Sequence, residues 1–563
     1  MEPIAAHDDA PLPEIALQEF GAILRKAIER EFPSASAPEI IFEAPRRPEF
    51  GDFATNVAFF LGREAKRSPQ ETASRLLERA FSESPRVRSL FAQAQALGGF
   101  INLRLAPACW QANLALILHE RERFGIAAPN GIRVSLEFGS ANPTGPLVVV
   151  QGRTMSIGQT LTNAMRSRGY SVGTEWIIND VGAQMDLLGR SLYARYRQLK
   201  EPAYPLPEDG YPGEYLIAIA QRIFEAEGDR WVACAQAEWL PHFSLAGRDA
   251  IVAEHQAVAS RFRVHFDRWQ SERELHESGR VLADLQRLTD RGFTYQEDGA
   301  LYFRATLFGD DKDRVLVRSD GRPTYYAPDI AYHYEKLQRS DRVIDILGPD
   351  HHGYIGRLKG VADALGFPGA LEVIIAQQIT LARGTESLSI SKRAGTIVSL
   401  SEILDEVGVD AARFFFIMLA PDSPLKFDLA LAKERSENNP VYYVQYSHAR
   451  ISSVFKNARR DEIDEAAAGA SLDRLTEPAE LALIRRLCDL PRLVTNVIDQ
   501  FAPHRLTQYA RDVASDFHQF YAECRILVDD RELRLARLGL CLAARTVLAH
   551  VLELIGVTSP ESM

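Results

Sequence analysis

Residues 131–178 decide the fold and read GIRVSLEFGSANPTGPLVVVQGRTMSIGQTLTNAMRSRGYSVGTEWII. Apolar residues alternate with polar ones from Ile132 to Phe138, as in a strand with one covered face. A turn rich in Asn, Pro and Gly follows at 142–146, and apolar residues then recur at helical spacing from Ile157 to Met165. A second strand is expected at 174–178. This strand, loop, helix, strand order predicts a parallel sheet whose ligand lies at the carboxyl ends of the strands.

The chain on either side of this unit divides into two further regions. The first ~110 residues read as a small α/β unit with a helix from about Glu14 to Glu31. After Ser399 the pattern is helical to about Leu554, and Ser399 and Glu402 have the spacing of a capping box. We therefore expect an α/β fold in three parts: an N-terminal α/β domain at 1–112, a Rossmann-like domain at 113–400 with insertions at about 200–290, and an all-helical domain at 401–563.

Composition indicates a folded globular chain. Hydrophobic residues make up 46% of its 563 residues, charged residues 25%, and the mean hydropathy is -0.17. The longest apolar stretch, Leu540 to Val557, contains Arg545, His550 and Glu553, so we interpret it as a core helix and expect no membrane contact. The formal net charge of -11 means that any nucleic-acid binding must use local basic faces.

The N-terminus and the cysteines both favour a cytoplasmic protein. The first residues, MEPIAAHDDA, are acidic where a signal peptide would be basic and then apolar. The five cysteines, Cys109, Cys234, Cys488, Cys524 and Cys541, show no CxxC spacing. They are typical of buried thiols, so we expect no structural metal.

The loop between the first strand and its helix carries the first distinctive motif. No GxxxxGK[ST] or GxGxxG motif occurs anywhere in the chain. Residues 137–153, EFGSANPTGPLVVVQGR, instead resemble the signature region of arginyl-tRNA synthetases, which runs into the class I HIGH tetrapeptide. The residues that match this pattern are Glu137, Ser140, Asn142, Pro143, Gly145, Pro146, Leu147 and Arg153. The tetrapeptide positions do not match, because they hold Val148, Val149, Val150 and Gln151.

A second motif, SISKRAG at 389–395, resembles the KMSKR loop of the same family. The resemblance places Lys392 beside the ATP phosphates, with Ser391 next to it. A lysine suits this position because a mobile point charge can follow phosphate as its negative charge redistributes. The alternative is an ordinary basic surface loop.

The segment from Asp320 to Asp350 resembles a peptide of the arginine enzyme in particular. The resemblance implies that Tyr325 and Asp329, with Glu137, recognise the arginine side chain, and that Asn142 holds its amino-acid end. Carboxylates match the fixed donors of a planar guanidinium. Taken alone, these two residues are better interpreted as a helix cap (Asp329) and a core residue (Tyr325), and it is the resemblance of the surrounding segment that reverses this.

Two further groups of residues are assigned by the resemblance. Asp350 and His352 belong to a D-H-H-G-Y segment beside the ATP pocket, although Asp350-His351-His352 could also suggest metal ligands. Residues 438–458 resemble the helical anticodon-binding domain. There Tyr442, Tyr443, Tyr446, His448 and Arg450 would stack on bases and bind phosphate, unless the aromatics are core residues.

The resemblance implies an arginine–tRNA ligase with ATP, Mg²⁺, arginine and tRNA(Arg) as partners, acting as a monomer. In that reaction the arginine carboxylate attacks the α-phosphate of ATP, and a tRNA ribose hydroxyl then takes the arginyl group. Lys392 and Gln151 are the catalytic candidates that remain. Loss of each HIGH histidine removes a donor of ~3–4 kcal/mol, and Val150 obstructs a backbone approach that Gly permits. A catalytically impaired paralogue that binds tRNA or arginine is therefore the alternative.

Overall fold

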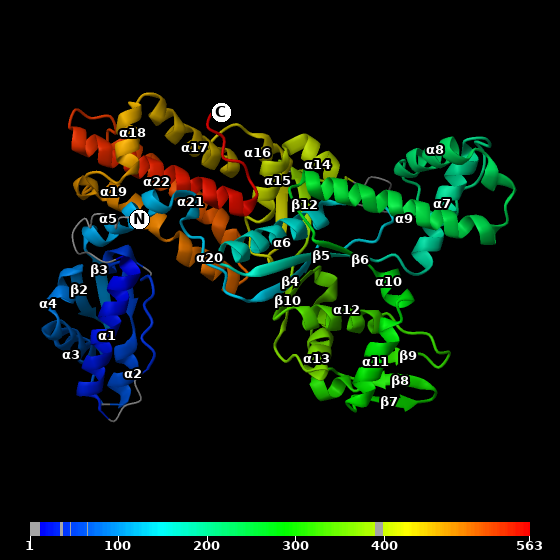
Figure 1. Ribbon diagram of the computed structural model, residues 1–563, viewed down its shortest axis with the longest axis horizontal. Coiled ribbons are helices and arrows are strands. Elements are labelled where there is room, and N and C mark those ends of the chain that lie inside the picture. The colour runs from blue at the N-terminus through cyan, green and yellow to red at the C-terminus, as the bar shows by residue number, and fades with distance from the viewer. Residues whose placement is uncertain (1–11, 34–37, 46, 65, 385, 389–397) are drawn as a thin grey trace.

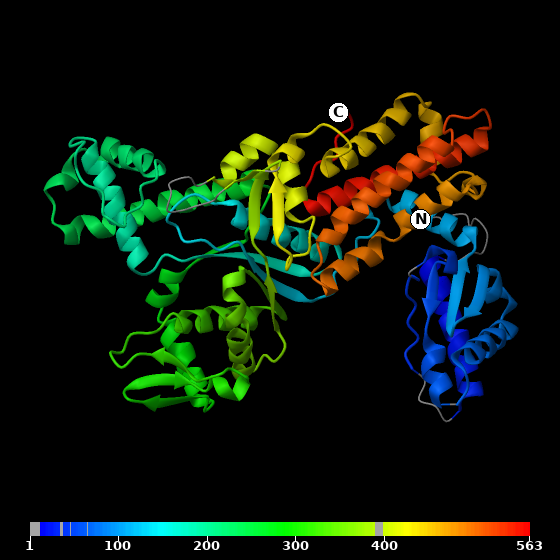
Figure 2. The ribbon, with the colours of Figure 1, turned by 180° about the vertical axis from the view of Figure 1, so that it is seen from behind.

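The computed structural model describes residues 12–33, 38–45, 47–64, 66–384, 386–388 and 398–563 (Figure 1). An N-terminal domain, a central sheet with two lobes, and a helical domain follow one another along the chain. Figure 2 shows from behind that the N-terminal domain and the lobe with β7–β9 hang from the same side of this central body, separated from one another.

The N-terminal domain packs helices on an antiparallel sheet of order β1-β3-β2. Helices α1 and α3 pack together around Phe20, Leu24, Leu76 and Ile101, all fully buried. Its elements are α1 (Pro13–Glu31), β1 (Phe53–Thr55), α2 (Val57–Glu64), α3 (Pro69–Glu83), α4 (Pro85–Ser89), β2 (Phe91–Leu97) and β3 (Phe100–Leu105). Helix α5 (Pro107–Glu120) then packs against the helical domain.

The predicted parallel sheet is confirmed, with the strand order β11-β10-β4-β5-β6. Helix α6 (Val149–Ser167) covers one face, and a Cβ on Gly158 would lie 2.1 Å from the ring of Phe138, so this glycine lets α6 approach β4 closely. Helix α12 (Tyr326–Arg339) covers the other face. The strands are β4 (Arg133–Phe138), β5 (Ser171–Ile178), β6 (Arg268–Ser271), β10 (Arg342–Leu347) and β11 (Leu371–Ile375).

Two lobes extend from the sheet, and the insertion expected at about 200–290 falls across both of them. The first lobe has its own aromatic core and consists of α7 (Ala183–Gln198), α8 (Tyr215–Glu227) and α9 (Gln236–Arg261). The second lobe shares a core with α12. It contains α10 (Glu272–Glu277), α11 (Arg280–Asp290), β7 (Thr294–Glu297), β8 (Ala300–Phe303), β9 (Arg314–Val317) and α13 (Ile355–Leu365).

The C-terminal region is helical, with one correction to the sequence prediction. Strand β14 (Leu425–Asp428) pairs in parallel with β12 (Ile379–Arg383), which also pairs with β13 (Glu386–Leu388). The helices are α14 (Leu400–Val407), α15 (Val409–Phe416), α16 (Leu429–Lys433), α17 (Pro440–Lys456), α18 (Arg460–Ala467), α19 (Pro478–Cys488), α20 (Leu490–Asp499), α21 (His504–Glu523) and α22 (Arg531–Ile555).

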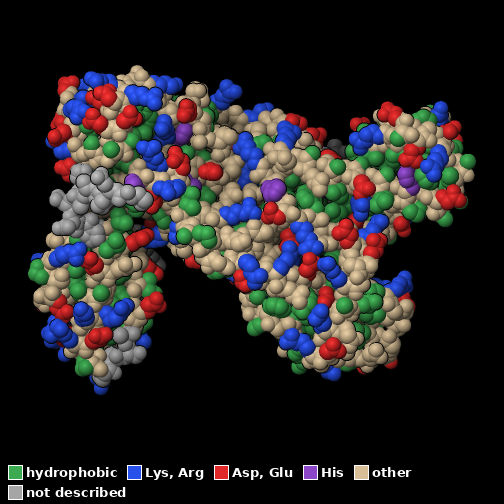
Figure 3. Space-filling view, viewed as in Figure 1, with side chains coloured by type: hydrophobic (Ala, Val, Ile, Leu, Met, Phe, Trp, Pro, Cys, Tyr) green, Lys and Arg blue, Asp and Glu red, His purple; other side chains and the backbone are tan. Residues whose placement is uncertain are grey.

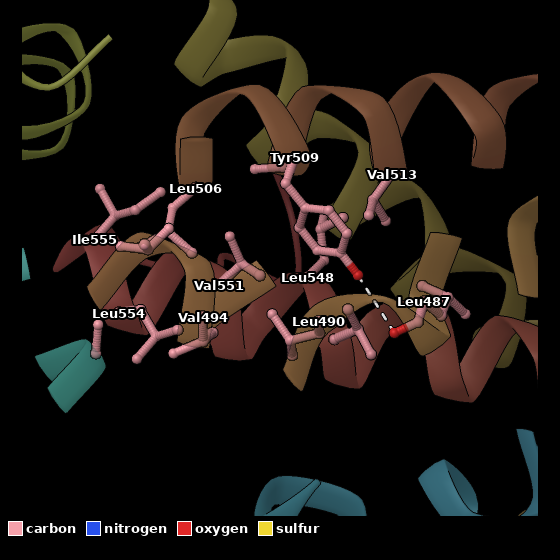
Figure 4. Packing of buried hydrophobic residues seen from close by; sticks show 14 of the residues in the cluster. Leu487, Leu490, Val494, Leu506, Tyr509, Val513, Leu548, Val551, Leu554 and Ile555 are labelled. Atoms are coloured by element: carbon pink, nitrogen blue, oxygen red, sulfur yellow. Dashed lines mark hydrogen bonds between the residues drawn. The ribbon is translucent and has the colours of Figure 1, made fainter. Parts of the chain in front are cut away.

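Among the described residues, α22 alone is long and apolar enough to cross a membrane, and 67% of its apolar window is buried inside the protein. Figure 4 shows Leu548, Val551 and Ile555 of this helix packed against residues of α19 to α21, with Tyr509 donating its hydroxyl to the carbonyl oxygen of Leu487. Burial of this kind identifies α22 as a core helix of the domain.

Candidate active site

The loop that leads from β4 into α6 is braced by the first lobe. The hydroxyl of Tyr215 in α8 donates to the carbonyl of Thr144 at 2.5 Å, and His255 Nε2 in α9 donates to the carbonyl of Gly145 at 2.8 Å. Burial lowers the pKa of His255, so the ring is neutral and carries its proton on the nitrogen that faces Gly145. Residues 143–147 are therefore fixed at the carboxyl edge of the sheet.

The other side of the same loop meets the segment that follows residues 389–397. The backbone N–H of Leu400 donates to the carbonyl of Leu147 at 2.7 Å, and Val148 forms an isolated antiparallel bridge with Ser399. Ser399 caps α14 together with Glu402, as the capping-box spacing predicted. The fold thus brings residues 399–400 against the loop before α6, whereas the motif at 389–395, with Ser391 and Lys392, lies outside the described residues.

The first turn of α6 has few polar groups. Val148 and Val149 are buried, Val150 is half-buried, and the side-chain oxygen of Gln151 accepts the backbone N–H of Val148 at 3.1 Å. Because Val148 has no side-chain oxygen, no side chain of the described residues caps this turn. The first N–H groups of α6 and the positive end of its dipole therefore remain as the polar features at this point.

Three carboxylates form a row across the sheet beneath α12. Glu175 of β5, Glu137 of β4 and Asp345 of β10 occupy paired positions on neighbouring strands, so their side chains leave the same face. Lys336 of α12 is fully buried, with its Nζ 2.7 Å from Glu137 and also bonded to Asp345. Arg339 of α12 pairs with Glu175. We call these three acids and their partners the buried charge row.

His333 links the buried charge row to the first turn of α12. Its Nδ1 lies 2.7 Å from the carbonyl of Asp329 and its Nε2 lies 2.7 Å from the carboxylate of Asp345. Both partners are acceptors, so both ring nitrogens carry protons. Burial opposes this charge, but Asp345 raises the pKa of His333 above its usual value. Three cations, His333, Lys336 and Arg339, therefore balance the three acids.

Asp329 lies in the first turn of α12, at the carboxyl edge of the sheet. Its Oδ2 accepts the hydroxyl of Tyr354 at 2.6 Å. Tyr325 precedes α12, has 69% of its surface exposed, and places its ring 6.1 Å from that of Tyr354. Burial and the nearby charges of Asp329 and Asp180 raise the pKa of Glu272, the first residue of α10, to about 7. Asp329 and Glu272 thus lie close enough to influence one another, and two neighbouring carboxylates suit a cationic ligand.

The remaining predicted substrate residues are placed as follows. Asn142 is exposed after β4, where its Oδ1 accepts the Nδ2 of Asn179 at 3.3 Å. Asp350 is exposed in a short 3-10 helix after β10, while the side chain of His352 lies outside the described set. Glu137 is 6% exposed, and its carboxylate is paired with Lys336. It therefore lies within the buried charge row, beneath α12.

The proposed RNA-binding residues of α17 fall on two faces of the helix. Tyr442 and Tyr446 stack at 6.2 Å, and the Arg450 guanidinium lies over the rings of Tyr446 and Tyr521. Half-buried Tyr443 packs against His518. His448 is 4% exposed and bonds the carbonyl of Pro560 at 2.8 Å, so it faces the core and cannot stack on a base.

Several residues that shape the site were missed by the sequence analysis. They are His333, Lys336, Asp345, Glu175, Tyr354 and Glu272. A signal was present for the strand residues, because Glu175 and Asp345 each interrupt an otherwise apolar strand pattern. A carboxylate in the middle of a buried strand needs a cationic partner, and the helix that covers the strand can supply it.

Comparisons with known proteins agree with this architecture. Residues 18–105 match the family described as arginyl tRNA synthetase N terminal domain, residues 236–416 match tRNA synthetases class I (R), catalytic domain, and residues 444–563 match the DALR anticodon binding domain. The three matches follow the order of the observed domains. They leave out residues 106–235, which include the loop before α6.

Curated relatives match almost the whole chain. The arginine–tRNA ligase of Syntrophotalea carbinolica is 42% identical over 540 residues, which cover 95% of this chain and 97% of that protein. The arginine–tRNA ligase of Moorella thermoacetica is 43% identical and covers 97% of this chain and 98% of that protein. The solved Thermus thermophilus arginyl-tRNA synthetase, 20% identical with a TM-score of 0.76 over 97% of this chain and 100% of that chain, has the same fold.

Proposed function

We propose that this chain, which belongs to the arginyl-tRNA synthetase family, is an arginine–tRNA ligase that activates arginine with ATP and transfers it to tRNA(Arg). The observation that carries this proposal is the similarity to arginine–tRNA ligases along nearly the full length of both chains. That similarity favours a working ligase over an impaired paralogue.

Arginine would bind at the carboxyl edge of the sheet, between Asp329 and Asn142. The Asp329 carboxylate would accept the guanidinium, Tyr325 would cover it, and Asn142 would hold the amino-acid end. The hydroxyl of Tyr354 holds one oxygen of Asp329 and so fixes the direction in which the carboxylate points. Glu137, which is paired with Lys336, would add negative charge beneath the guanidinium.

ATP would bind where the loop before α6 meets the start of α14. The uncapped N–H groups and the dipole of α6 fit a phosphate there. Ser391, Lys392, Asp350 and His352 are the side chains that we expect around the nucleotide, and Gln151 retains an amide that can donate. Magnesium bound with ATP would neutralise phosphate charge during attack. Because the carboxylate of arginine and the α-phosphate must meet in line, the role of the protein is mainly to position them.

The tRNA would be read on α17 by Tyr442, Tyr446 and Arg450, with Tyr521 of α21 beside them. Stacked tyrosines under a guanidinium offer the flat faces and positive charge that single-stranded loops bind. Figure 3 shows Lys and Arg mixed with Asp and Glu over the surface, so RNA contacts must be local in a chain of net charge -11. We expect a cytoplasmic monomer.

Direct charging of tRNA tests the proposal. Purified protein would be incubated with labelled arginine, ATP, Mg²⁺ and tRNA(Arg), with lysine in place of arginine as the control. We expect arginyl-tRNA to form only when all four components are present. If neither this chain nor a variant with restored HIGH residues charges tRNA(Arg), the proposed function is wrong. If only the restored variant is active, the chain is an impaired member of its family.

A further inference from the structure

Asp180 lies at the carboxyl edge of the sheet, two residues after β5, and it is fully buried. Its Oδ2 accepts the hydroxyl of Ser271 and a guanidinium N–H of Arg248, both at 2.8 Å, and its Oδ1 accepts the backbone N–H of Arg273 at 3.0 Å. Burial of a carboxylate is costly unless donors of this kind satisfy it. Asp180 has no part in the binding scheme above, and its role follows from the elements that supply these donors.

Two of the donors belong to the start of α10. Ser271 is the last residue of β6 and the N-cap of α10, where its hydroxyl oxygen accepts the N–H of Glu274 at 3.3 Å. Arg273 gives a second N–H of this turn to the Asp180 carboxylate. Glu272 lies between Ser271 and Arg273 in the chain. Both neighbours of Glu272 are thus tied to one carboxylate, which fixes the position of Glu272 beside Asp329.

The chain just before Asp180 reaches the residue that we expect to hold the amino-acid end of arginine. Asn179 donates its Nδ2 to the Oδ1 of Asn142 at 3.3 Å. Ile178, the last residue of β5, forms an isolated parallel bridge with Ala141. The contacts that hold Asp180 therefore also hold the strand end against which Asn142 lies.

The third donor, Arg248, connects Asp180 to the first lobe. Arg248 lies in α9 seven residues before His255, so the two side chains leave the same face of the helix about two turns apart. His255 bonds the carbonyl of Gly145 in the loop before α6. This loop keeps its own braces, His255 and Tyr215, when Asp180 is changed, so an effect of Asp180 should appear at the arginine site rather than at the nucleotide loop.

We propose that Asp180 is a positioning residue for arginine, which holds the start of α10 and the end of β5 so that Glu272 and Asn142 keep their places at the arginine site. This inference rests on the proposed function, because it concerns the amino-acid substrate of that function. Asp180 is fully buried and acts through its neighbours. Such support is required because the side chains of a binding site are precise only when the residues behind them are fixed.

Asp267 provides a matched control at the amino end of β6. It directly precedes β6, as Asp180 follows β5, although it is more exposed. It accepts the same three kinds of donor: the N–H and the hydroxyl of Thr174, both at 2.9 Å, and the guanidinium of Arg166 at 3.1 Å. Asp267→Asn therefore weakens the same kinds of bond on the same two strands, away from their carboxyl ends.

Calorimetric titration with arginine, and separately with ATP and Mg²⁺, tests the proposal in wild type, Asp180→Asn, Asp267→Asn and Ser271→Ala. Ser271→Ala is the milder variant, because it removes one donor and leaves Asp180 paired with Arg248. We expect Asp180→Asn to weaken arginine binding about tenfold and Ser271→Ala about threefold, as for the loss of a hydrogen bond to a charged group. ATP binding should stay the same in both, and Asp267→Asn should bind both ligands like wild type.

The pH dependence of arginine affinity separates positioning from a general loss of stability. Glu272 is faced by the charges of Asp329 and Asp180 and by His276 of its own helix at 3.9 Å. Burial and the two acids raise the pKa of Glu272 to about 7. Asp180→Asn removes one of these charges, so the pKa of Glu272 should fall and the rise in arginine affinity should move to lower pH. A variant that is only less stable would keep the wild-type midpoint.

The inference is overturned if folded Asp180→Asn binds arginine with the affinity and the pH midpoint of wild type. It is equally overturned if ATP binding weakens as much as arginine binding, or if Asp267→Asn shows the same loss. If Asp180→Asn does not fold, Ser271→Ala decides, and an unchanged arginine affinity in that variant overturns the inference. A wild-type protein that binds no arginine would instead contradict the proposed function itself.

Discussion

The two faces of the central sheet differ in how completely their polar groups are matched. On the α12 face, Glu137, Glu175 and Asp345 are balanced by Lys336, Arg339 and His333, and each acid has a partner within hydrogen-bonding distance. On the α6 face, the turn that should hold a nucleotide presents Val148, Val149 and Val150. The amino-acid side thus offers matched charges and Asp329, whereas the described residues of the α6 turn offer backbone N–H groups and the amide of Gln151.

From this difference we infer that arginine binding and the rate of arginine activation depend on different residues of the site. A buried row of acids and bases fixes α12, and with it Asp329, whether or not ATP is present. Donors aimed at phosphate contribute mainly when charge develops in the transition state. We therefore expect arginine recognition to be independent of the α6 turn, and the activation step of this ligase to be slower than it would be with both histidines present.

The largest effect should come from restoring the α6 turn. The variant Val148→His, Val150→Gly, Gln151→His should accelerate arginine-dependent ATP–pyrophosphate exchange, with tRNA(Arg) present, by about 10⁴-fold or more, because it restores two donors and each donor lost from such a site costs about 10²–10³ in rate. Val150→Gly alone serves as the control for steric relief. Equal rates for the triple variant and wild type would refute this account of the turn.

The buried charge row should be the next most sensitive region. Lys336→Met leaves buried carboxylates without their cation and should lower the free energy of unfolding by about 3–5 kcal/mol. The same substitution at exposed Lys433, which lies 3.5 Å from Glu406, should change it by less than about 1 kcal/mol. Denaturant titrations of both variants measure the contrast, and similar losses would mean that the row does not stabilise the sheet.

A smaller effect is expected from loosening Asp329. Tyr354→Phe removes the hydroxyl that orients this carboxylate and should raise the KM for arginine by about 5- to 30-fold, with kcat little changed. Tyr326→Phe is the matched control, because it removes a buried hydroxyl that bonds the carbonyl of Arg357 instead. An unchanged KM in Tyr354→Phe would show that Asp329 needs no such support.

The smallest predicted effect is a pH dependence of arginine binding. With a pKa of about 7, Glu272 is largely neutral at pH 6 and ionised at pH 8. A bound guanidinium favours the ionised form of Glu272. At pH 6 arginine binding must therefore displace a proton from Glu272, whereas at pH 8 it need not, so the KM for arginine should fall by about three- to tenfold over this range. Glu272→Gln should flatten the profile. A wild-type profile that is already flat would place Glu272 outside the site.

Local pattern was enough to predict some elements of this fold. The alternation up to Phe138 predicts β4, and the helical spacing after it predicts α6. The spacing of Ser399 and Glu402 predicts the start of α14, and the structure confirms all three elements. Each of these depends on residues close together in the chain. The same reasoning could not find β14, since a strand of four residues is stabilised by pairing with β12 rather than by its own sequence.

The candidate site was harder to predict because it depends on strand order. Glu137 meets Asp345 only because β4 and β10 are neighbours, and Lys336 reaches both only because α12 crosses them. The resemblance assigns Glu137 to the arginine side chain, and that role stays a prediction; the structure adds that Glu137 is 6% exposed and paired with Lys336. His448 was predicted to bind RNA, but the C-terminal segment at Pro560 covers its face of α17. This contact joins residues far apart in the chain, so the local sequence did not reveal it.

Calorimetric titration with arginine and with citrulline tests the central claim most directly, since citrulline has nearly the same shape without the charge. We predict that wild type binds arginine at least about tenfold more tightly than citrulline, because hydrogen bonds to charged groups contribute about 1.5–3 kcal/mol. We also predict that Asp329→Asn removes most of this difference in affinity. Equal affinity for the two ligands in wild type, or an undiminished preference in Asp329→Asn, would contradict the account.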